Sequence, residues 1–131
     1  LIRERGITLE YETKTVMISV NPELFSRLLV NLVSNAYRYG RENGHIRVRL
    51  WQEDSSLVLS VADDGIGIAR NEQEKIFRRF YQADASRGGE GTGLGLAMVY
   101  EIARFYHGTV TVESVVDQGS TFVVRMPAGQ S

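Results

Sequence analysis

Two glycine-rich segments contain the residue types best suited to chemistry in this chain. The first reads DDGIG over residues 63–67, and the second reads GTGLGL over residues 91–96. The carboxylate of Asp63 can accept a hydrogen bond from the exocyclic amine of adenine but would face the carbonyl oxygen of guanine, so it favours ATP over GTP. The second segment leads into a predicted helix, whose first backbone amides lack intrahelical partners and attract phosphate. Together the segments indicate a purine nucleotide site, although either one alone could be an ordinary turn.

A polar strip on a predicted helix could supply the metal and phosphate contacts of such a site. The helix is predicted over residues 22–39, between an Asn-Pro-Glu start signal and a glycine stop. Asn31, Asn35 and Arg38 recur at i, i+4 and i+7 on the border of its apolar face. Carboxamide oxygens suit Mg²⁺, which takes its remaining ligands from water and phosphates, and an arginine can bind phosphate directly. The trio alone fits a solvated helix face better, but the glycine-rich segments favour the metal and phosphate interpretation.

Hydrophobic periodicity predicts the elements that must position these residues. Alternating apolar residues predict a half-buried strand at 7–11 and further strands at 16–20, 46–50, 57–62, 110–112 and 122–124, the last two forming a hairpin. Helical spacing predicts a short segment at 72–80 and a second long helix from about residue 93 to 107 that ends at Gly108. Both long helices have a broad apolar face, so we predict an α+β fold, a two-layer α/β sandwich with helices on one face of the sheet. These patterns do not predict the strand order.

The composition narrows the possible classes of function. The chain has 131 residues, no cysteine and a net charge of -1 from 15 basic and 16 acidic residues. This size predicts one domain, the balanced charge argues against a nucleic-acid partner, and the lack of thiols excludes disulfides and thiolate metal sites. Charges interrupt every apolar stretch before it could cross a bilayer, so we expect a cytoplasmic domain without direct membrane contact. Because the chain starts at Leu1, we also expect a fragment of a longer protein, which could itself be membrane-anchored.

Five motifs resemble, in order, those of the sensor histidine kinases. They are LLVNLVSNAYRYG at 28–40 (the N box), DDGIG at 63–67 (first glycine box), IFRRFY at 76–81 (phenylalanine box), GTGLGL at 91–96 (second glycine box) and GSTF at 119–122 (closing glycine motif). The resemblance implies the Bergerat ATP-binding fold, with a mixed, mostly antiparallel sheet, which is shared with gyrase, Hsp90 and MutL. It identifies residues 1–131 as a single catalytic and ATP-binding domain of a two-component kinase, with an ATP lid at about 69–90.

The resemblance also implies a role for each matching residue. Asn35 would coordinate Mg²⁺, with Asn31 one turn earlier at the same site and Arg38 on phosphate, and these three would carry catalysis. Asp63 would bind the adenine amine, assisted through water by Thr121. Further contacts are expected from Tyr39 to the nucleoside, from Gly65, Gly67 and Ile68 around the base, from Gly91, Thr92, Gly93, Leu94, Gly95 and Leu96 around the phosphates, and from Arg79 in the lid.

Two phenylalanines and two histidines are expected to be structural. Phe77 and Phe80 would anchor the lid through apolar contacts rather than bind the ligand. His107 precedes the predicted helix stop and His45 lies in a turn, so neither is expected to be phosphorylated. The phosphoacceptor histidine of such kinases belongs to a separate helical dimerisation domain.

The implied reaction is transfer of the γ-phosphoryl group of Mg-ATP to that histidine, on the same or a paired subunit, which then supplies a response-regulator aspartate. ATP-hydrolysing relatives place a glutamate near position 31 to activate water, and asparagine cannot act as that base. The alternatives are an anti-sigma-type protein-serine kinase, an ATP-gated chaperone or topoisomerase module, and a non-catalytic ATP-binding module. We expect the isolated domain to be monomeric and the full-length protein to be a homodimer.

Overall fold

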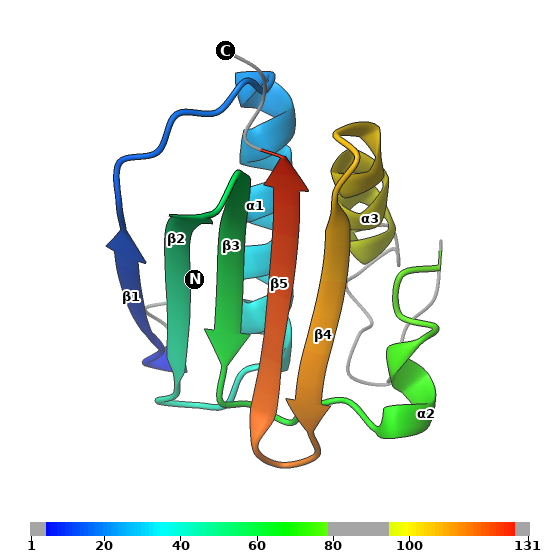
Figure 1. Cartoon of the computed structure of the whole chain (residues 1–131). Coiled ribbons are helices and arrows are strands. Elements are labelled where there is room, and N and C mark those ends of the chain that lie inside the picture. Colours follow the sequence, from blue (N-terminus) through cyan, green and yellow to red (C-terminus); the bar gives the residue numbers. More distant parts are fainter. Residues whose placement is uncertain (1–4, 79–94, 128–131) are drawn as a thin grey trace.

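A five-stranded sheet carries two long helices on one of its faces (Figure 1). A computed structural model describes residues 5–78 and 95–127 of the chain. The elements are β1 (Thr8–Thr13), α1 (Pro22–Tyr39), β2 (His45–Glu53), β3 (Ser56–Asp63), α2 (Arg70–Gln73), α3 (Gly95–Phe105), β4 (Thr109–Val115) and β5 (Gly119–Pro127). The strands lie in the order β1-β2-β3-β5-β4, with β1 parallel to β2 and all other neighbours antiparallel. The predicted α+β fold with a mixed, mostly antiparallel sheet is therefore confirmed.

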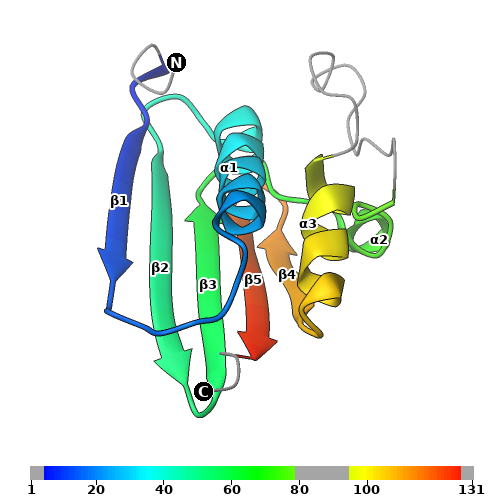
Figure 2. The ribbon, with the colours of Figure 1, turned by 90° about the horizontal axis from the view of Figure 1, so that it is seen from above.

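The hydrophobic core lies between the sheet and the two long helices. Figure 2 shows α1 and α3 side by side on the same face, with α1 over β2 and β3 and α3 over β4 and β5. The buried side chains are Leu28, Leu32 and Ala36 of α1, Ala97, Val99, Ile102 and Ala103 of α3, and Ile46, Val48, Leu57, Leu59, Val61, Phe122, Val124 and Met126 of the sheet. Burial of one such large apolar side chain stabilises the fold by about 1.5–3 kcal/mol, so this layer is a firm support for the loops at its edge.

Helix α1 has the predicted boundaries because both of its ends carry local signals. Asn21 Oδ1 accepts hydrogen bonds from the amides of Glu23 at 2.8 Å and Leu24 at 3.2 Å, which pairs two of the amides that a helix start leaves open. Pro22 occupies the first helical position, and Gly40 follows the last. The polar strip of the N box is therefore held on a helix whose register is fixed.

The two strand predictions nearest the N-terminus are wrong in part. All residues of β1 are exposed, and only Ile7, just before it, is buried in the core. Because β1 is the edge strand and α1 packs over β2 and β3, Leu9 and Tyr11 have no helix above them. No strand forms at 16–20, where residues 14–21 are a loop whose alternate side chains Val16, Ile18 and Val20 pack against the core without a strand partner.

The end of α3 also differs from the prediction. The left-handed residue after the helix is His107, with φ of 63°, rather than Gly108. The amide of Gly108 donates to the Ala103 carbonyl at 2.7 Å and that of His107 to the Arg104 carbonyl at 2.9 Å, which is the hydrogen-bond pattern of a Schellman motif. Gly108 is required for a different reason, since a Cβ there would clash with the carbonyl of Arg125 on β5.

The segment predicted as a helix at 72–80 forms only the short α2 and the turns that follow it up to residue 78. Its apolar residues still reach the core, because Ile76 is buried and the Phe77 ring lies 6.1 Å from Phe122 and 6.2 Å from Tyr100. This agrees with the expected anchoring role of Phe77, whereas Phe80 lies outside the described residues. Nowhere in 5–78 or 95–127 is a helix long and apolar enough to cross a membrane.

Candidate nucleotide-binding site

The first glycine loop, residues 63–68, leaves the sheet where β3 ends, next to the end of α1 and the β4–β5 turn (Figure 1). Asp63 is the last residue of β3, and its Oδ1 accepts a hydrogen bond from the Gly65 amide at 2.9 Å. Burial raises the pKa of Asp63 to about 6, and the nearby charge of Asp64 adds to this, while hydrogen bonds from the backbones of Gly65 and Ser120 act against it. A half-buried carboxylate that has lost part of its hydration is a strong acceptor for a donor on a ligand.

The neighbouring aspartate is already committed to the protein. Asp64 Oδ1 accepts from the backbone amide of His45 at 2.9 Å, and Oδ2 lies 3.0 Å from His45 Nδ1. Although its slight burial acts to raise it, these hydrogen bonds lower the pKa of Asp64 below the usual value. Of the two adjacent carboxylates, Asp63 is therefore the better candidate for ligand recognition, and its role in binding adenine stays a prediction. His45 has the structural role expected of it, through Asp64.

The glycines of the loop are needed because other backbone segments approach it closely. A Cβ at Gly65 would clash with the carbonyl of Tyr39, and a Cβ at Gly67, whose φ is +73°, would clash with the carbonyl of Val115. The sequence predicted that these glycines shape a base pocket. The close approaches in the structure are instead to the protein's own main chain, so the pocket role stays a prediction.

The register of β5 corrects one predicted contact. Ser120 lies opposite Asp63, and Thr121 lies opposite Ala62. Because successive side chains of a strand point to opposite faces, Thr121 projects away from the face that carries Asp63, and the residue placed to assist it is Ser120. Ser120 is buried, and its Oγ lies 2.8 Å from Ser114 Oγ.

Ser114 belongs to a group of hydrogen-bonded residues that support the loop. The sequence did not predict this group. The Ser114 hydroxyl accepts from the Ile68 amide at 2.7 Å and also contacts the Gly119 carbonyl at 2.8 Å. The side-chain amide of Gln73 donates to the carbonyls of Ile68 at 2.9 Å and Ser114 at 3.2 Å. The sequence signal for Ser114 was a small polar residue on the half-buried face of β4, in line with Val110 and Val112. Ile68, predicted as a base contact, packs its side chain against the core.

The polar strip of α1 meets the start of α3. Asn31 Nδ2 donates to the Arg27 carbonyl at 2.9 Å, and its Oδ1 lies 3.3 Å from where a Cβ of Gly95 would be. The structure thus brings the N box to the last glycine of the second glycine box. Asn35, Arg38 and Tyr39 are half-buried along the rest of the strip.

Several predicted contacts fall outside the described residues. They are Arg79 of the lid and Gly91, Thr92, Gly93 and Leu94 of the second glycine box. Of that box, Gly95 begins α3 and Leu96 packs against the core, and the predicted ligand contacts of both residues stay predictions.

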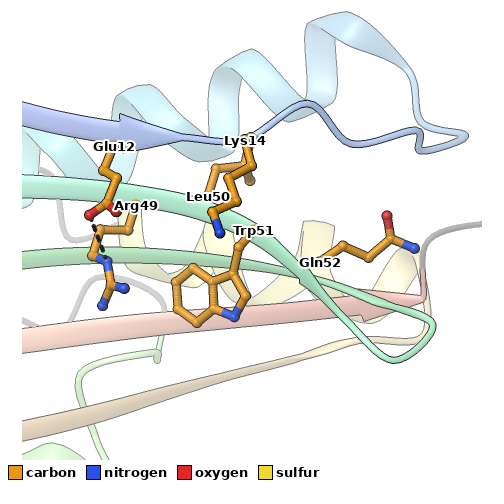
Figure 3. Close-up of a pocket in the computed structure, with 6 residues that line it drawn as sticks. All are labelled: Glu12, Lys14, Arg49, Leu50, Trp51 and Gln52. Atoms are coloured by element: carbon orange, nitrogen blue, oxygen red, sulfur yellow. Dashed lines mark ion pairs between the residues drawn. The ribbon is translucent and has the colours of Figure 1, made fainter.

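A separate pocket lies between the ends of β1 and β2, at the opposite end of β2 from His45 and the first glycine loop (Figure 3). It is lined by Glu12, Lys14, Arg49, Leu50, Trp51 and Gln52. Arg49 lies 3.5 Å from Glu12 Oε1 and stacks over the Trp51 ring at 4.9 Å. The charge of Arg49 is therefore paired with that of Glu12 on the surface of the sheet. None of the predicted site residues lines this pocket.

Comparison with known proteins agrees with the motifs. The family described as "Histidine kinase-, DNA gyrase B-, and HSP90-like ATPase" matches residues 20–130. The circadian input-output histidine kinase CikA of Synechococcus elongatus is 36% identical over 123 residues, which cover 92% of this chain and 16% of the relative. The sensor histidine kinase RppB of Synechocystis sp. is 40% identical over 109 residues, which cover 82% of this chain and 24% of the relative. The chain thus spans less than a quarter of the length of these two kinases.

Solved structures of the same kind share the fold. The mycobacterial sensor histidine kinase MprB matches with a TM-score of 0.87 and 26% identity, covering 99% of this chain and 90% of that one. Full-length ShkA in complex with AMPPNP matches with a TM-score of 0.85 and 27% identity, covering 98% of this chain and 27% of that one. The histidine kinase ThkA in complex with the response regulator protein TrrA matches with a TM-score of 0.77 and 26% identity, covering 98% of this chain and 36% of that one.

Proposed function

The chain belongs to the family of histidine kinase-, DNA gyrase B- and HSP90-like ATPases, as a catalytic domain of the protein-histidine kinase type, and we propose that it binds Mg-ATP and transfers the γ-phosphoryl group to a histidine on a separate phosphoacceptor domain. In this proposal residues 1–131 act as one catalytic domain in the cytoplasm, with a lid at about 69–90. The full-length protein is a homodimer whose phosphohistidine supplies a response regulator, the partner that ThkA has in its complex with TrrA.

The observation that carries the proposal is that α1 connects the two glycine boxes. At its end, the Tyr39 carbonyl accepts the Ile66 amide of the first glycine loop at 3.0 Å. Earlier on the same helix, Asn31 faces Gly95 at the start of α3. The helix rises about 12 Å between Asn31 and Tyr39, so the base and the phosphates of one nucleotide can lie along it. The structural relative ShkA was solved with the ATP analogue AMPPNP, which supports nucleotide binding.

The side chains of α1 fit a magnesium and phosphate site. Asn31 commits its amide nitrogen to the Arg27 carbonyl, so its oxygen is the atom turned toward Gly95. Carboxamide oxygens suit a hard cation that keeps water and phosphate oxygens as its other ligands. We therefore assign Asn35 as the metal ligand with Asn31 beside it, Arg38 to phosphate and Asp63 to the adenine amine. Bound Mg²⁺ would neutralise charge on the phosphoryl group during its transfer.

The same residues favour transfer to histidine over hydrolysis. Asn31 cannot remove a proton from water, so a water molecule at this position would stay a poor nucleophile. An imidazole nitrogen is a better nucleophile and needs mainly in-line positioning and charge neutralisation, which backbone amides, Arg38 and a bound Mg²⁺ would supply.

The proposal is tested by phosphate incorporation into the full-length protein from γ-labelled ATP with Mg²⁺. Asn35→Ala should lower incorporation by about 100-fold while the circular dichroism spectrum is unchanged, because loss of a metal-site group typically costs this much. Ser34→Ala removes an exposed group from the neighbouring position of α1 and should leave incorporation unchanged. Normal labelling of Asn35→Ala would refute the metal role, and ATP binding without any labelling of the wild type would favour a non-catalytic module.

A further inference from the structure

The side chain of Arg41 joins two segments of the site that have no strand ladder between them. Its Nε donates to the Asp64 carbonyl at 2.6 Å, and its Nη2 donates to the Asp117 carbonyl at 2.8 Å and the Gly65 carbonyl at 3.4 Å. Asp64 and Gly65 belong to the first glycine loop, whereas Asp117 lies in the β4–β5 turn, residues 116–118. Arg41 itself follows Gly40 at the end of α1, so one guanidinium ties the loop, the turn and the helix together.

Two main-chain hydrogen bonds also join the loop to α1 and to the turn, in addition to the bonds of Asp64 with His45 and of Ile68 with Ser114. Ile66 donates its amide to the Tyr39 carbonyl at 3.0 Å and accepts at its carbonyl from the Asp117 amide at 2.8 Å. Asp117 has a φ of 69°, which is a costly backbone conformation for a residue with a side chain. Hydrogen bonds from a guanidinium are charge-assisted and stronger than bonds between neutral groups. The exposed Arg41 thus adds three charge-assisted hydrogen bonds to those that hold the loop and the turn in their observed arrangement.

A short path of contacts leads from Arg41 to the carboxylate of Asp63. Arg41 binds the carbonyl of Gly65, and the amide of Gly65 donates to Asp63 Oδ1 at 2.9 Å. The carbonyl of the intervening Asp64 is the closest partner of Arg41. The Gly65 amide thus helps to set the direction of the Asp63 carboxylate, and Arg41 holds the carbonyls of Asp64 and Gly65 on either side of that amide.

We propose that Arg41 is a positioning residue for base selection. The inference rests on the proposed nucleotide binding, because it assigns to Arg41 the task of holding Asp63 in place. A fixed carboxylate accepts from the amine of adenine and meets the carbonyl oxygen of guanine at the same point, so it separates ATP from GTP. When the loop is loosened, the carboxylate can withdraw, which weakens ATP binding and lowers the penalty against GTP.

The test compares three variants of the chain by calorimetric binding of ATP and of GTP. Arg41→Met keeps the apolar stem and removes every donor. Arg41→Lys keeps the charge but lacks the fork that reaches several carbonyls. Arg47→Met is the matched control, because Arg47 is an exposed arginine of β2 that pairs with Glu10 at 3.4 Å, so its loss removes the same charge away from the loop.

We expect Arg41→Met to raise the Kd for ATP about five-fold and to lower the ratio of GTP to ATP dissociation constants about ten-fold, with Arg41→Lys between it and the wild type. Amide hydrogen exchange without nucleotide should quicken at residues 64–66 and 117 in Arg41→Met but not in Arg47→Met. A general loss of stability or of positive charge would weaken the binding of ATP and of GTP equally, and it would leave the ratio of their dissociation constants unchanged.

The outcomes separate this inference from the proposed function. A wild type that binds ATP and rejects GTP, together with an Arg41→Met variant that keeps the same ratio and the same exchange rates, would overturn the role of Arg41 alone. Failure of both Arg41 variants to fold would also overturn it, since Arg41 would then serve global stability. A wild type that binds no ATP would overturn the proposed function and this inference with it.

Discussion

Asp63→Asn should make the nucleotide-free domain more stable and its ATP complex weaker. The carboxylate of Asp63 is half-buried, and burial is the largest cause of the rise of its pKa from 3.8 to about 6. Asparagine has nearly the same shape and keeps an oxygen that can accept from the Gly65 amide. The substitution therefore removes a dehydrated charge while it preserves the local hydrogen bond.

The magnitude follows from the linkage between proton binding and folding. A rise of the pKa from 3.8 to about 6 means that the ionised carboxylate lowers the free energy of unfolding by at most about 3 kcal/mol. Because the carboxylate keeps some contact with solvent, we expect an effect of about 1–2 kcal/mol. Because the folded protein holds this proton more tightly than the unfolded chain does, wild-type stability should fall as the pH rises from about 4 to about 6. The destabilisation by the ionised Asp63 is complete above about pH 6 and absent below about pH 4.

Urea unfolding of the 131-residue chain at pH 4.5 and pH 7.5 measures this effect. Asp63→Asn should raise the free energy of unfolding at pH 7.5 by about 1–2 kcal/mol and change it little at pH 4.5. Asp54→Asn, an exposed site in the β2–β3 turn, controls for the loss of one negative charge.

Calorimetry of ATP binding supplies the second half of the prediction. Replacement of a charge-assisted hydrogen bond by a neutral one should weaken ATP binding about ten-fold at pH 7.5. Wild-type affinity should rise with pH through about 6, and that dependence should be lost in Asp63→Asn. A variant that is less stable than the wild type at pH 7.5, or that binds ATP as tightly, would refute the assignment of Asp63 as a dehydrated acceptor.

Two further predictions concern the scaffold. Leu32→Ala should lower the free energy of unfolding in urea by about 3 kcal/mol because Leu32 is fully buried, whereas Val30→Ala, on the same helix but 57% exposed, should cost less than about 0.5 kcal/mol; similar costs would contradict the assigned faces of α1. His107→Gly should raise the melting temperature by relieving about 0.5–1 kcal/mol of left-handed backbone strain, and an unchanged or lower value would show that the imidazole makes a compensating contact.

The parts of the fold that could be predicted from sequence are those set by local chemistry. Both ends of helix α1 were predicted correctly because each end has a local sequence signal. The start has a side-chain cap and a proline, and a glycine follows the last residue. The strand at 16–20 failed because alternation reports which side chains are half-buried and does not report whether a neighbouring strand exists. Val16, Ile18 and Val20 alternate toward the core from a loop.

The same division applies within the candidate site. The type and position of Asp63 predicted a carboxylate at the end of a strand, which the structure confirms. Ser120 was missed in favour of Thr121 because the choice depends on the register between β3 and β5, which no local pattern fixes. Arg41 was missed because its partners are main-chain carbonyls as far as 76 positions away, and a carbonyl has no signature in the sequence.

Asp63 and Asp64 show that residue type alone does not determine the role of a side chain. The two are adjacent and chemically identical, yet burial raises the pKa of the first, while hydrogen bonds from His45 lower the pKa of the second. The difference arises because β3 ends between them: Asp63 is still held by the pairing with Ser120, whereas Asp64 has turned toward the start of β2. In the first glycine loop Asp64 thus helps to fix the position of the main chain, and Asp63 is the carboxylate for which we propose the recognition of the base. Base selection would therefore depend on the contacts that set where β3 ends, among them those of Arg41, as much as on Asp63 itself.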